Sequence, residues 1–382
     1  MEYKLSDLFD LQMGKTPDRH IPEYWADGTE QWISIADLSK CDKYIEETAE
    51  AISEQAVNDS GIKIIPASTV IMSFKLSIGK VAITPKPMYS NEAIMAFIDK
   101  GVIPIEPTYL YFLLKAKDWD EGTNKAVMGK TLNKATLSQV KVHIHDLAEQ
   151  RKIIRTLEKA ESMVTTRRQQ LTALDTLIKA RFVELFGDSK VNPYGFNKVR
   201  LKDSCEIVTG NTPSRTVDDY YGDYIEWIKT DNIMAEMMYP TRATESLSEV
   251  GLKVGRYVEK GAILMACIAG SVASIGKVCI TDRQVAFNQQ INAIVPKKYN
   301  ALFLYVLLQT SKDYLVEELN MALKGILSKS KLGEKTFILP PMDQQNDFAA
   351  FVAQIDKSKA VVQKALDEAQ TLFDSLMQQY FG

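Results

Sequence analysis

The chain has 382 residues, of which 46% are hydrophobic and 25% charged, a composition that is typical of a folded globular protein and excludes disorder. No apolar run approaches the roughly 18 residues that a membrane span needs, and the N-terminus lacks the pattern of a secretory signal. The four cysteines are scattered without a Cys-x-x-Cys pair, so we expect a cytoplasmic protein with no disulfide framework, zinc ribbon or membrane contact. A net charge of −3 is low for a free-standing nucleic-acid-binding domain, so any such contact must use local basic surfaces or partner chains.

The sequence is an internal repeat that consists of two copies of one unit. Residues 77–81 (Ser-Ile-Gly-Lys-Val) recur unchanged as 274–278. Other identical positions keep an offset of 195 to 197 residues along the whole chain: Leu5, Gly14, Thr16, Trp32, Asn91, Leu132, Gln150 and Phe186 match Leu201, Gly210, Thr212, Trp227, Asn288, Leu327, Gln345 and Phe381. An offset this constant leaves room only for loop-sized insertions, so the two copies should share one fold.

Each copy begins with a globular part and ends in a long helix. Short β-branched runs such as 69–72 and 81–84 predict strands, while 109–115 and 301–309 predict one helix in each copy. The segments that we expect are a first domain at 1–145, a first long helix at 146–187, a second domain at 188–340 and a second long helix at 341–382. The predicted fold class is therefore α+β, with two α/β domains and two long helices in a pseudo-twofold internal repeat.

The two long segments have the pattern of a coiled coil. Residues 150–186 contain no glycine or proline, and apolar side chains recur at alternating steps of three and four, which the second copy repeats. The first helix carries a net charge of +4 and the second −2, which favours antiparallel pairing over roughly 55 Å with one domain at each end. The alternative is that each helix packs on its own domain. The residues expected to pair the helices are Leu157, Val164, Leu171, Leu174, Ile178, Ile355, Val362, Leu366, Phe373 and Leu376.

No catalytic set is repeated in the two copies. Neither a Ser/His/Asp nor a Cys/His arrangement, nor a pair of carboxylates, recurs. The pair His143 and His145 has no match in the second copy, which favours a surface or structural role over a metal or general-base role. The residues that do recur are Gly, Thr, Pro, Trp, Ser, Lys and Asn, which suit turns and polar contacts. We therefore expect no catalytic site, no metal and no cofactor in this chain.

Polar and basic residues of the repeat are candidates for contact with DNA. The turns at 14–17 and 210–213 offer N–H groups and side chains to phosphate, although they also suit purely structural turns, and Lys80 and Lys277 suit phosphate contact or solvated surface equally. The phosphate candidates are Lys15, Thr16, Asn211, Thr212, Lys80, Lys277, Lys125, Lys130, Lys134, Lys324, Lys329 and Lys331. Base-reading side chains should lie where the copies differ or carry amides, and these candidates are Ser34, Ser73, Lys75, Asn91, Arg215, Lys229, Thr230, Asp231, Asn232 and Gln289. Trp32 and Trp227 are expected in the core.

Over its whole length the chain resembles the specificity subunits of type I restriction–modification enzymes. The resemblance is carried by the two Ser-Ile-Gly-Lys-Val runs, by 287–290 (Phe-Asn-Gln-Gln), and by 338–345 (Ile-Leu-Pro-Pro-Met-Asp-Gln-Gln) leading into a long helix. The first copy departs from the last motif, because His145 and Asp146 stand where the second has Pro340 and Pro341.

The resemblance implies a non-catalytic chain with two target-recognition domains, each reading half of a bipartite site in double-stranded DNA. The helices would set the gap and dock two modification subunits, which bind S-adenosylmethionine and methylate adenine, while restriction subunits use ATP and Mg²⁺. A coiled-coil adaptor that never touches DNA is the alternative function. A free-standing methyltransferase would need a glycine-rich cofactor loop after a strand, which the sequence lacks.

Overall fold

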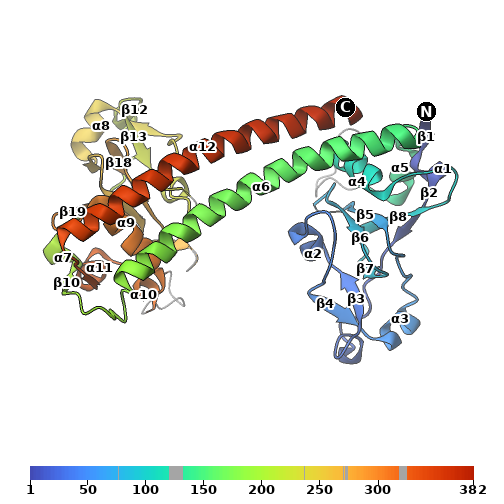
Figure 1. Ribbon diagram of the computed structural model, residues 1–382, viewed down its shortest axis with the longest axis horizontal. Helices are drawn as coiled ribbons and strands as arrows, with labels where there is room; N and C mark the ends of the chain where they lie inside the picture. The colour runs from blue at the N-terminus through green and yellow to red at the C-terminus, as the bar shows by residue number, and fades with distance from the viewer. Residues whose placement is uncertain (76, 120–131, 236, 270, 272–273, 318–324) are drawn as a thin grey trace. The chain divides into compact units, whose positions relative to one another are not determined.

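The computed structural model describes residues 1–75, 77–119, 132–235, 237–269, 271, 274–317 and 325–382 (Figure 1). The chain forms two compact units: unit 1 is Met1–Arg167 with Ala365–Gly382, and unit 2 is Arg168–Lys364. Within the described ranges, no helix combines the length and apolarity that crossing a membrane would require.

Unit 1 is built on a four-stranded antiparallel sheet of order β2-β8-β5-β6. A three-stranded sheet of order β4-β3-β7 lies beside it, and in that sheet β3 runs parallel to β7. The strands are β1 (Glu2–Lys4), β2 (Phe9–Met13), β3 (Glu30–Ile33), β4 (Glu50–Ile52), β5 (Thr69–Ser73), β6 (Val81–Thr84), β7 (Tyr89–Ser90), β8 (Ile94–Asp99) and β9 (Lys141–His143), with β1 paired to β9. The helices are α1 (Leu5–Leu8), η1 (Pro22–Tyr24), α2 (Ile35–Lys40), α3 (Glu54–Ser60), α4 (Pro107–Ala116) and α5 (Lys134–Gln139).

The four-stranded sheet is buried on both faces. Val70 and Met72 enter the core that contains α4, while Ile71 between them enters a second core with Leu38 of α2. Successive strand residues point to opposite faces, so a sheet covered on both sides needs apolar residues at every position. This explains why 69–72 and 81–84 read as continuous apolar runs rather than as alternating ones, and both are confirmed as strands.

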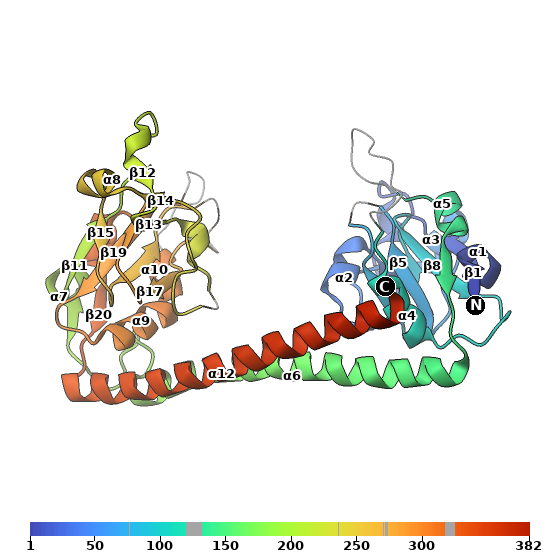
Figure 2. The ribbon, with the colours of Figure 1, turned by 90° about the horizontal axis from the view of Figure 1, so that it is seen from above.

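Unit 2 repeats this architecture. Its four-stranded antiparallel sheet has the order β11-β19-β16-β17, and its second sheet, β12-β14-β13-β18-β15, again contains one parallel pair, β13 with β18. The strands are β10 (Lys198–Arg200), β11 (Cys205–Thr209), β12 (Tyr221–Gly222), β13 (Ile225–Ile228), β14 (Ser246–Leu247), β15 (Tyr257–Val258), β16 (Ile263–Ala266), β17 (Val278–Ile280), β18 (Val285–Phe287), β19 (Ile291–Pro296) and β20 (Thr336–Ile338). The helices are α7 (Leu201–Ser204), η2 (Asp218–Tyr220), η3 (Thr230–Asn232), α8 (Glu249–Val254), α9 (Ala301–Thr310), α10 (Lys312–Val316) and α11 (Lys329–Glu334). The predicted helices at 109–115 and 301–309 are confirmed as α4 and α9, each of which covers one face of its own four-stranded sheet (Figure 2).

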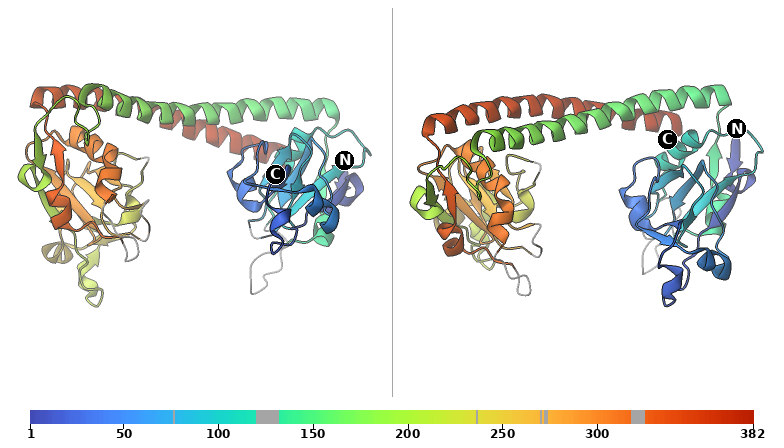
Figure 3. Two further views of the ribbon diagram at one scale, coloured as in Figure 1. Left: turned by 90° about the horizontal axis from the view of Figure 1, so that it is seen from below. Right: turned by 60° about the horizontal axis from the view of Figure 1, so that its bottom comes forward.

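The long helices α6 (Leu147–Phe186) and α12 (Met342–Phe381) contain 40 residues each. Each unit contains the first part of one helix and the last part of the other, and the two parts lie side by side (Figures 2 and 3). In unit 1, Leu157 and Val164 of α6 share a core with Phe373 of α12. In unit 2, Phe182 of α6 packs edge-on against Phe348 of α12 at a centroid distance of 5.6 Å. The predicted antiparallel pairing is therefore the arrangement within each unit.

The helices also pack on the globular parts, so the two arrangements that the sequence left open coexist. Leu157, Val164, Leu366, Phe373 and Leu376 belong to the core of unit 1 or pack against it, and Ile178 and Ile355 do the same in unit 2. Leu171, Leu174 and Val362 are half-buried and belong to neither core. Lys359, the basic residue that interrupts the apolar seam of α12, forms an ion pair of 2.7 Å with Asp175 of α6. The two side chains are 16% and 40% exposed, and a polar residue in an otherwise apolar seam favours the register in which it meets its partner.

A buried glutamine joins each long helix to its own domain. Gln150 is fully buried, accepts a hydrogen bond from Glu106 N–H and donates to Pro104 O and His145 O. Gln345, at 1% exposure, accepts from Asn300 N–H and donates to Pro340 O. Glu106 and Asn300 are the N-cap residues of α4 and α9. The same side chain therefore connects the start of each long helix to the start of its domain helix.

We expect Gln345→Ala to destabilise the protein, because two buried backbone groups lose their partner. The expected loss is about 1–3 kcal/mol for each group left unsatisfied. The neighbouring Gln344 is exposed, and Gln344→Ala should change stability by less than about 0.5 kcal/mol. Denaturant unfolding of the two variants beside the wild type measures the difference, and equal stability of both variants would contradict the role of the glutamine.

Candidate nucleic-acid interface

The backbone of the polar turn that follows β2 is hydrogen-bonded to strands β7 and β8. Gly14 N–H donates to Ile94 O and Lys15 N–H to Ser90 O. A Cβ at Gly14 would lie 2.2 Å from Ser90 O, so only glycine allows this close approach. The second copy repeats the arrangement: Gly210 N–H donates to Ile291 O, Asn211 N–H donates to Phe287 O, and a Cβ at Gly210 would lie 2.2 Å from Asn288 O. These N–H groups are therefore bonded within the protein. Lys15 and Thr212 are the exposed side chains of the turns, while Thr16 and Asn211 are half-buried.

A buried tryptophan supports each turn from the neighbouring strand. Trp32 Nε1 donates to Lys15 O at 3.0 Å, and Trp227 Nε1 donates to Asn211 O at 3.2 Å. The two indoles are 2% and 3% exposed, which confirms that they belong to the core. Each turn is thus fixed to its sheet by glycine on one side and by indole on the other.

The polar side chains of the turns donate hydrogen bonds to acceptors within the protein. Thr16 donates to a carboxylate oxygen of Glu92, and Thr212 donates to the amide oxygen of Gln289. Lys15 Nζ donates to Ser60 O at 2.5 Å, and Asn211 Nδ2 donates to Val254 O at 2.8 Å. The structure therefore places three predicted residues, Asn211, Thr212 and Gln289, next to one another.

An arginine that the sequence reading missed stands beside the first turn. The Cζ atom of Arg19 lies 3.6 Å from the ring centroid of Trp25 and 5.0 Å from that of Trp32. Its guanidinium binds Glu50 through two hydrogen bonds of 2.5 and 2.9 Å. We call Arg19, Trp25, Trp32 and Glu50 the first arginine cluster.

The second copy contains the equivalent cluster. Arg215 lies 4.5 Å from the ring centroid of Tyr221 and 5.1 Å from that of Trp227, and it pairs with Glu245 at 2.6 Å. Arg215 was predicted to read bases because the copies seemed to differ there, but Arg19 is its structural counterpart. Aligning the repeat at offsets of 195 and 196 matches Glu50 with Glu245 and Arg19 with Arg215, so the signal was present in the sequence.

The carboxylates of both clusters are held in the ionised form. The hydrogen bond from Arg19 lowers the pKa of Glu50, and the hydrogen bonds from Lys229 and Arg215 lower the pKa of Glu245. Lys229 also lies 5.3 Å from the ring centroid of Trp227. The position equivalent to Lys229 in the first copy is Ser34, so the second cluster has one more cation than the first.

Several predicted base-reading residues are engaged inside the protein. Ser34 caps α2 through Asp37, and Asn91 accepts a hydrogen bond from Ala93 N–H. Asn232 is 9% exposed and its amide donates to Thr241 and to Arg242 O, both at 3.1 Å. Each of these three side chains therefore makes at least one hydrogen bond within the protein.

The predicted lysines lie on several different elements. Lys80 Nζ donates to Ser39 at 2.6 Å, and Lys75 lies 5.3 Å from the ring centroid of Phe74. Lys134, Lys329 and Lys331 are exposed on the equivalent helices α5 and α11. Lys125, Lys130 and Lys324 lie outside the described residues.

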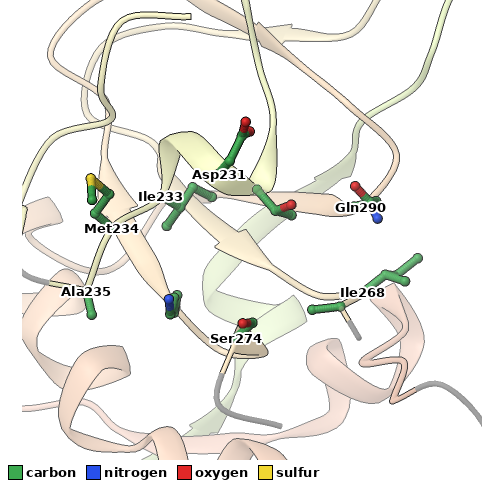
Figure 4. A pocket seen from close by; sticks show the side chains of 10 residues that line it. Asp231, Ile233, Met234, Ala235, Ile268, Ser274 and Gln290 are labelled. Atoms are coloured by element: carbon green, nitrogen blue, oxygen red, sulfur yellow. The ribbon is translucent and has the colours of Figure 1, made fainter. Parts of the chain in front are cut away.

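A pocket of about 420 Å³ in unit 2 contains further predicted residues. The residues that line it, drawn in Figure 4, are Thr230, Asp231, Ile233, Met234, Ala235, Ile268, Ala269, Ser274, Lys277 and Gln290. Thr230, Asp231 and Lys277 were all predicted to contact DNA. Among the ranges that the structure describes, no cluster of His, Cys, Asp and Glu side chains could hold a metal ion.

A charged network next to Trp227 distinguishes the second copy from the first. Glu226 pairs with Arg242 and, at 2.6 Å, with Arg283. Burial alone would raise the pKa of Glu226, but hydrogen bonds from both arginines and from Ala243 N–H outweigh it and lower the pKa to about 2. The equivalent residue of the first copy is Gln31, whose buried Oε1 has no partner.

Comparison with known proteins identifies relatives over the whole chain. Residues 1–175 and 193–370 match the family model described as "Type I restriction modification DNA specificity domain". The MjaIX specificity subunit of Methanocaldococcus jannaschii is 25% identical, over 98% of this chain and 90% of the relative. The HindI specificity subunit of Haemophilus influenzae is 30% identical over 37% of this chain and 34% of its own length.

Solved structures share the fold. The S subunit of a type I restriction–modification system from M. genitalium has a TM-score of 0.56 at 13% identity, covering 100% of this chain and 96% of that one. A chain from a structure of a type I R-M system and its assembly has a TM-score of 0.58 at 16% identity, with coverages of 100% and 97%.

We expect Glu226→Gln to be less stable than the wild type at neutral pH, because the substitution removes the charge between two arginines. Since the folded-state pKa lies below the ordinary value of 4.5, the ionised carboxylate stabilises the fold above that pH and loses its effect as the pH falls toward about 2. The difference in melting temperature between variant and wild type should therefore shrink over this interval. A difference that stays constant from pH 7 to pH 3 would contradict the assignment.

Proposed function

The chain belongs to the type I restriction–modification DNA specificity family, and from this membership we propose that each of its two domains reads one half of a bipartite site in double-stranded DNA. Members of this family are the non-catalytic specificity components of their complexes. The observation that carries the proposal is that one structural frame occurs twice, while the side chains around it differ between the two copies. Both units keep the glycine turn, the indole below it and the arginine cluster. Two similar but unequal readers suit two unequal half-sites.

We propose that the side chains that differ between the two copies select the bases. The network of Glu226, Arg242 and Arg283, the extra cation Lys229 and the pocket around Thr230 and Lys277 all belong to unit 2. Gln289 remains a candidate for an adenine edge because its side chain is exposed beside the second turn, where it accepts a hydrogen bond from Thr212. The exposed lysines of α5 and α11 are candidates for phosphate contact outside the reading surface.

The partners follow from the same assignment. We propose that two modification subunits bind S-adenosylmethionine and methylate adenine where this chain directs them, and that restriction subunits use ATP and Mg²⁺, all in the cytoplasm. The net charge of −3 supports an assembly in which other subunits supply much of the phosphate contact. We further propose that segments 1–145 and 188–340 read DNA, and that 146–187 and 341–382 form a spacer that sets the gap and docks the modification subunits.

The first test is the methylome of the source cell with and without the gene. We expect one split adenine-methylated motif to disappear when the gene is deleted and to return when it is restored. A complex that forms without salt-dependent DNA binding, in a cell whose methylome does not change, would instead indicate a coiled-coil adaptor.

The second test changes the spacer. Removing one heptad from the middle of both α6 and α12 shortens each helix by about 10 Å, since an α-helix rises 1.5 Å per residue. At 3.4 Å per base pair, the gap of the methylated motif should shorten by about three base pairs. Removing five residues instead turns the following part of each apolar seam by about 140°, because an α-helix has 3.6 residues per turn, and should lower stability. An unchanged gap in the stable heptad variant would show that the helices do not act as a ruler.

A further inference from the structure

Each unit keeps an arginine on aromatic rings with a carboxylate bound to it, although the sequences around the two clusters have diverged. The side chains of Arg19 and Glu50 are 46% and 42% exposed, and those of Arg215 and Glu245 are 54% and 34% exposed. Ion pairs with this exposure contribute only about 0–1 kcal/mol to stability. Stability is therefore a weak reason for the same pair in both copies.

The chemistry of the pair suggests another reason. A guanidinium binds carboxylate and phosphate through the same pair of parallel N–H groups, so a carboxylate can occupy a phosphate site. The rings keep the guanidinium in position whether or not the carboxylate is bound, because Arg19 stacks on Trp25 at 3.6 Å. Trp32 contacts the same guanidinium and also supports the polar turn at Lys15.

We propose that Arg19 and Arg215 are contacts for DNA phosphates, and that Glu50 and Glu245 occupy these two sites in the free protein and thereby weaken binding to non-specific DNA. The proposal rests on the DNA-reading function proposed above. A correct half-site supplies base contacts that keep a phosphate next to the arginine long enough to replace the carboxylate. Non-specific DNA lacks these contacts and competes with the carboxylate on phosphate charge alone.

The two clusters differ in the number of cations that the carboxylate binds. Glu245 binds a second cation, Lys229, where the first copy has Ser34. Replacing Glu50 by glutamine releases one cation, whereas replacing Glu245 releases two. Each new phosphate contact changes the slope of log K against log salt concentration by about −0.9.

The test uses the full chain in complex with its modification subunits and a duplex without the recognition motif. Binding is followed by fluorescence anisotropy over a range of salt concentrations. We expect Glu50→Gln to tighten binding at low salt and to steepen the slope by about 0.9, and Glu245→Gln to steepen it by up to about 1.8. The double variant Arg19→Met with Glu50→Gln should lose the gain of Glu50→Gln.

Matched controls exist in both copies. Glu54 and Glu249 are exposed, occupy equivalent positions at the starts of α3 and α8, and have no ion-pair partner among the described side chains. Glu54→Gln and Glu249→Gln change the net charge by the same amount, and we expect them to leave the slope near that of the wild type. If they steepen it as much as Glu50→Gln does, or if the double variant retains the gain, the proposal is overturned.

Two further measurements keep the outcome unambiguous. If Glu50→Gln lowers the melting temperature, Glu50→Asp replaces it, because the shorter side chain keeps the charge but cannot reach both guanidinium nitrogens; an intermediate slope is then expected and a wild-type slope overturns the proposal. Binding of the wild-type complex to its methylated motif is measured in parallel. Loss of that binding contradicts the proposed function, whereas specific binding with unchanged slopes in the glutamine variants contradicts only this inference.

Discussion

The architecture depends on a hydrogen-bonded joint between two helices that are far apart in sequence. A buried glutamine near the start of each long helix satisfies the N-cap N–H of the domain helix and the carbonyl of the chain that enters the long helix. A leucine of similar size could fill the space but would leave these backbone groups without partners in a dry environment. The joint therefore determines where each long helix starts relative to its sheet, and everything along the helix follows from that start.

The long helices extend this constraint. In unit 2, Phe182 and Phe186 of α6 and Phe348 of α12 pack around Phe303 of α9, so one aromatic cluster contains the end of one helix, the start of the other and the domain helix. In unit 1 the corresponding place contains Tyr109 of α4 beside Phe381 of α12, with ring centroids 5.4 Å apart. Apolar packing provides most of the stability, while the ion pair of Lys359 with Asp175 favours one register.

The candidate interface combines a rigid frame with a variable surface. The glycine turns and indoles leave little freedom, because a Cβ would collide with backbone at Gly14 and at Gly210. On this frame the copies carry different charges: Glu226 with two arginines in unit 2 occupies the place of Gln31 in unit 1. Divergence on a fixed frame allows a new surface without a new fold, which is what the proposed reading of two unlike half-sites requires.

The sequence by itself determined the repeat, the strand and helix pattern of each copy, and the 3-4 seam of the long helices, because periodicity in apolar residues reports directly on which face is buried. It also pointed to the buried tryptophans and to the family. It did not reveal that the amide of Asn232 donates inside the protein, or that Arg19 and Arg215 each bind a carboxylate beside aromatic rings. Those facts depend on residues distant in the chain: Arg19 meets Glu50 across a loop, and Asn232 meets Thr241. Whether a polar side chain faces solvent is decided by tertiary contacts, which local pattern does not encode.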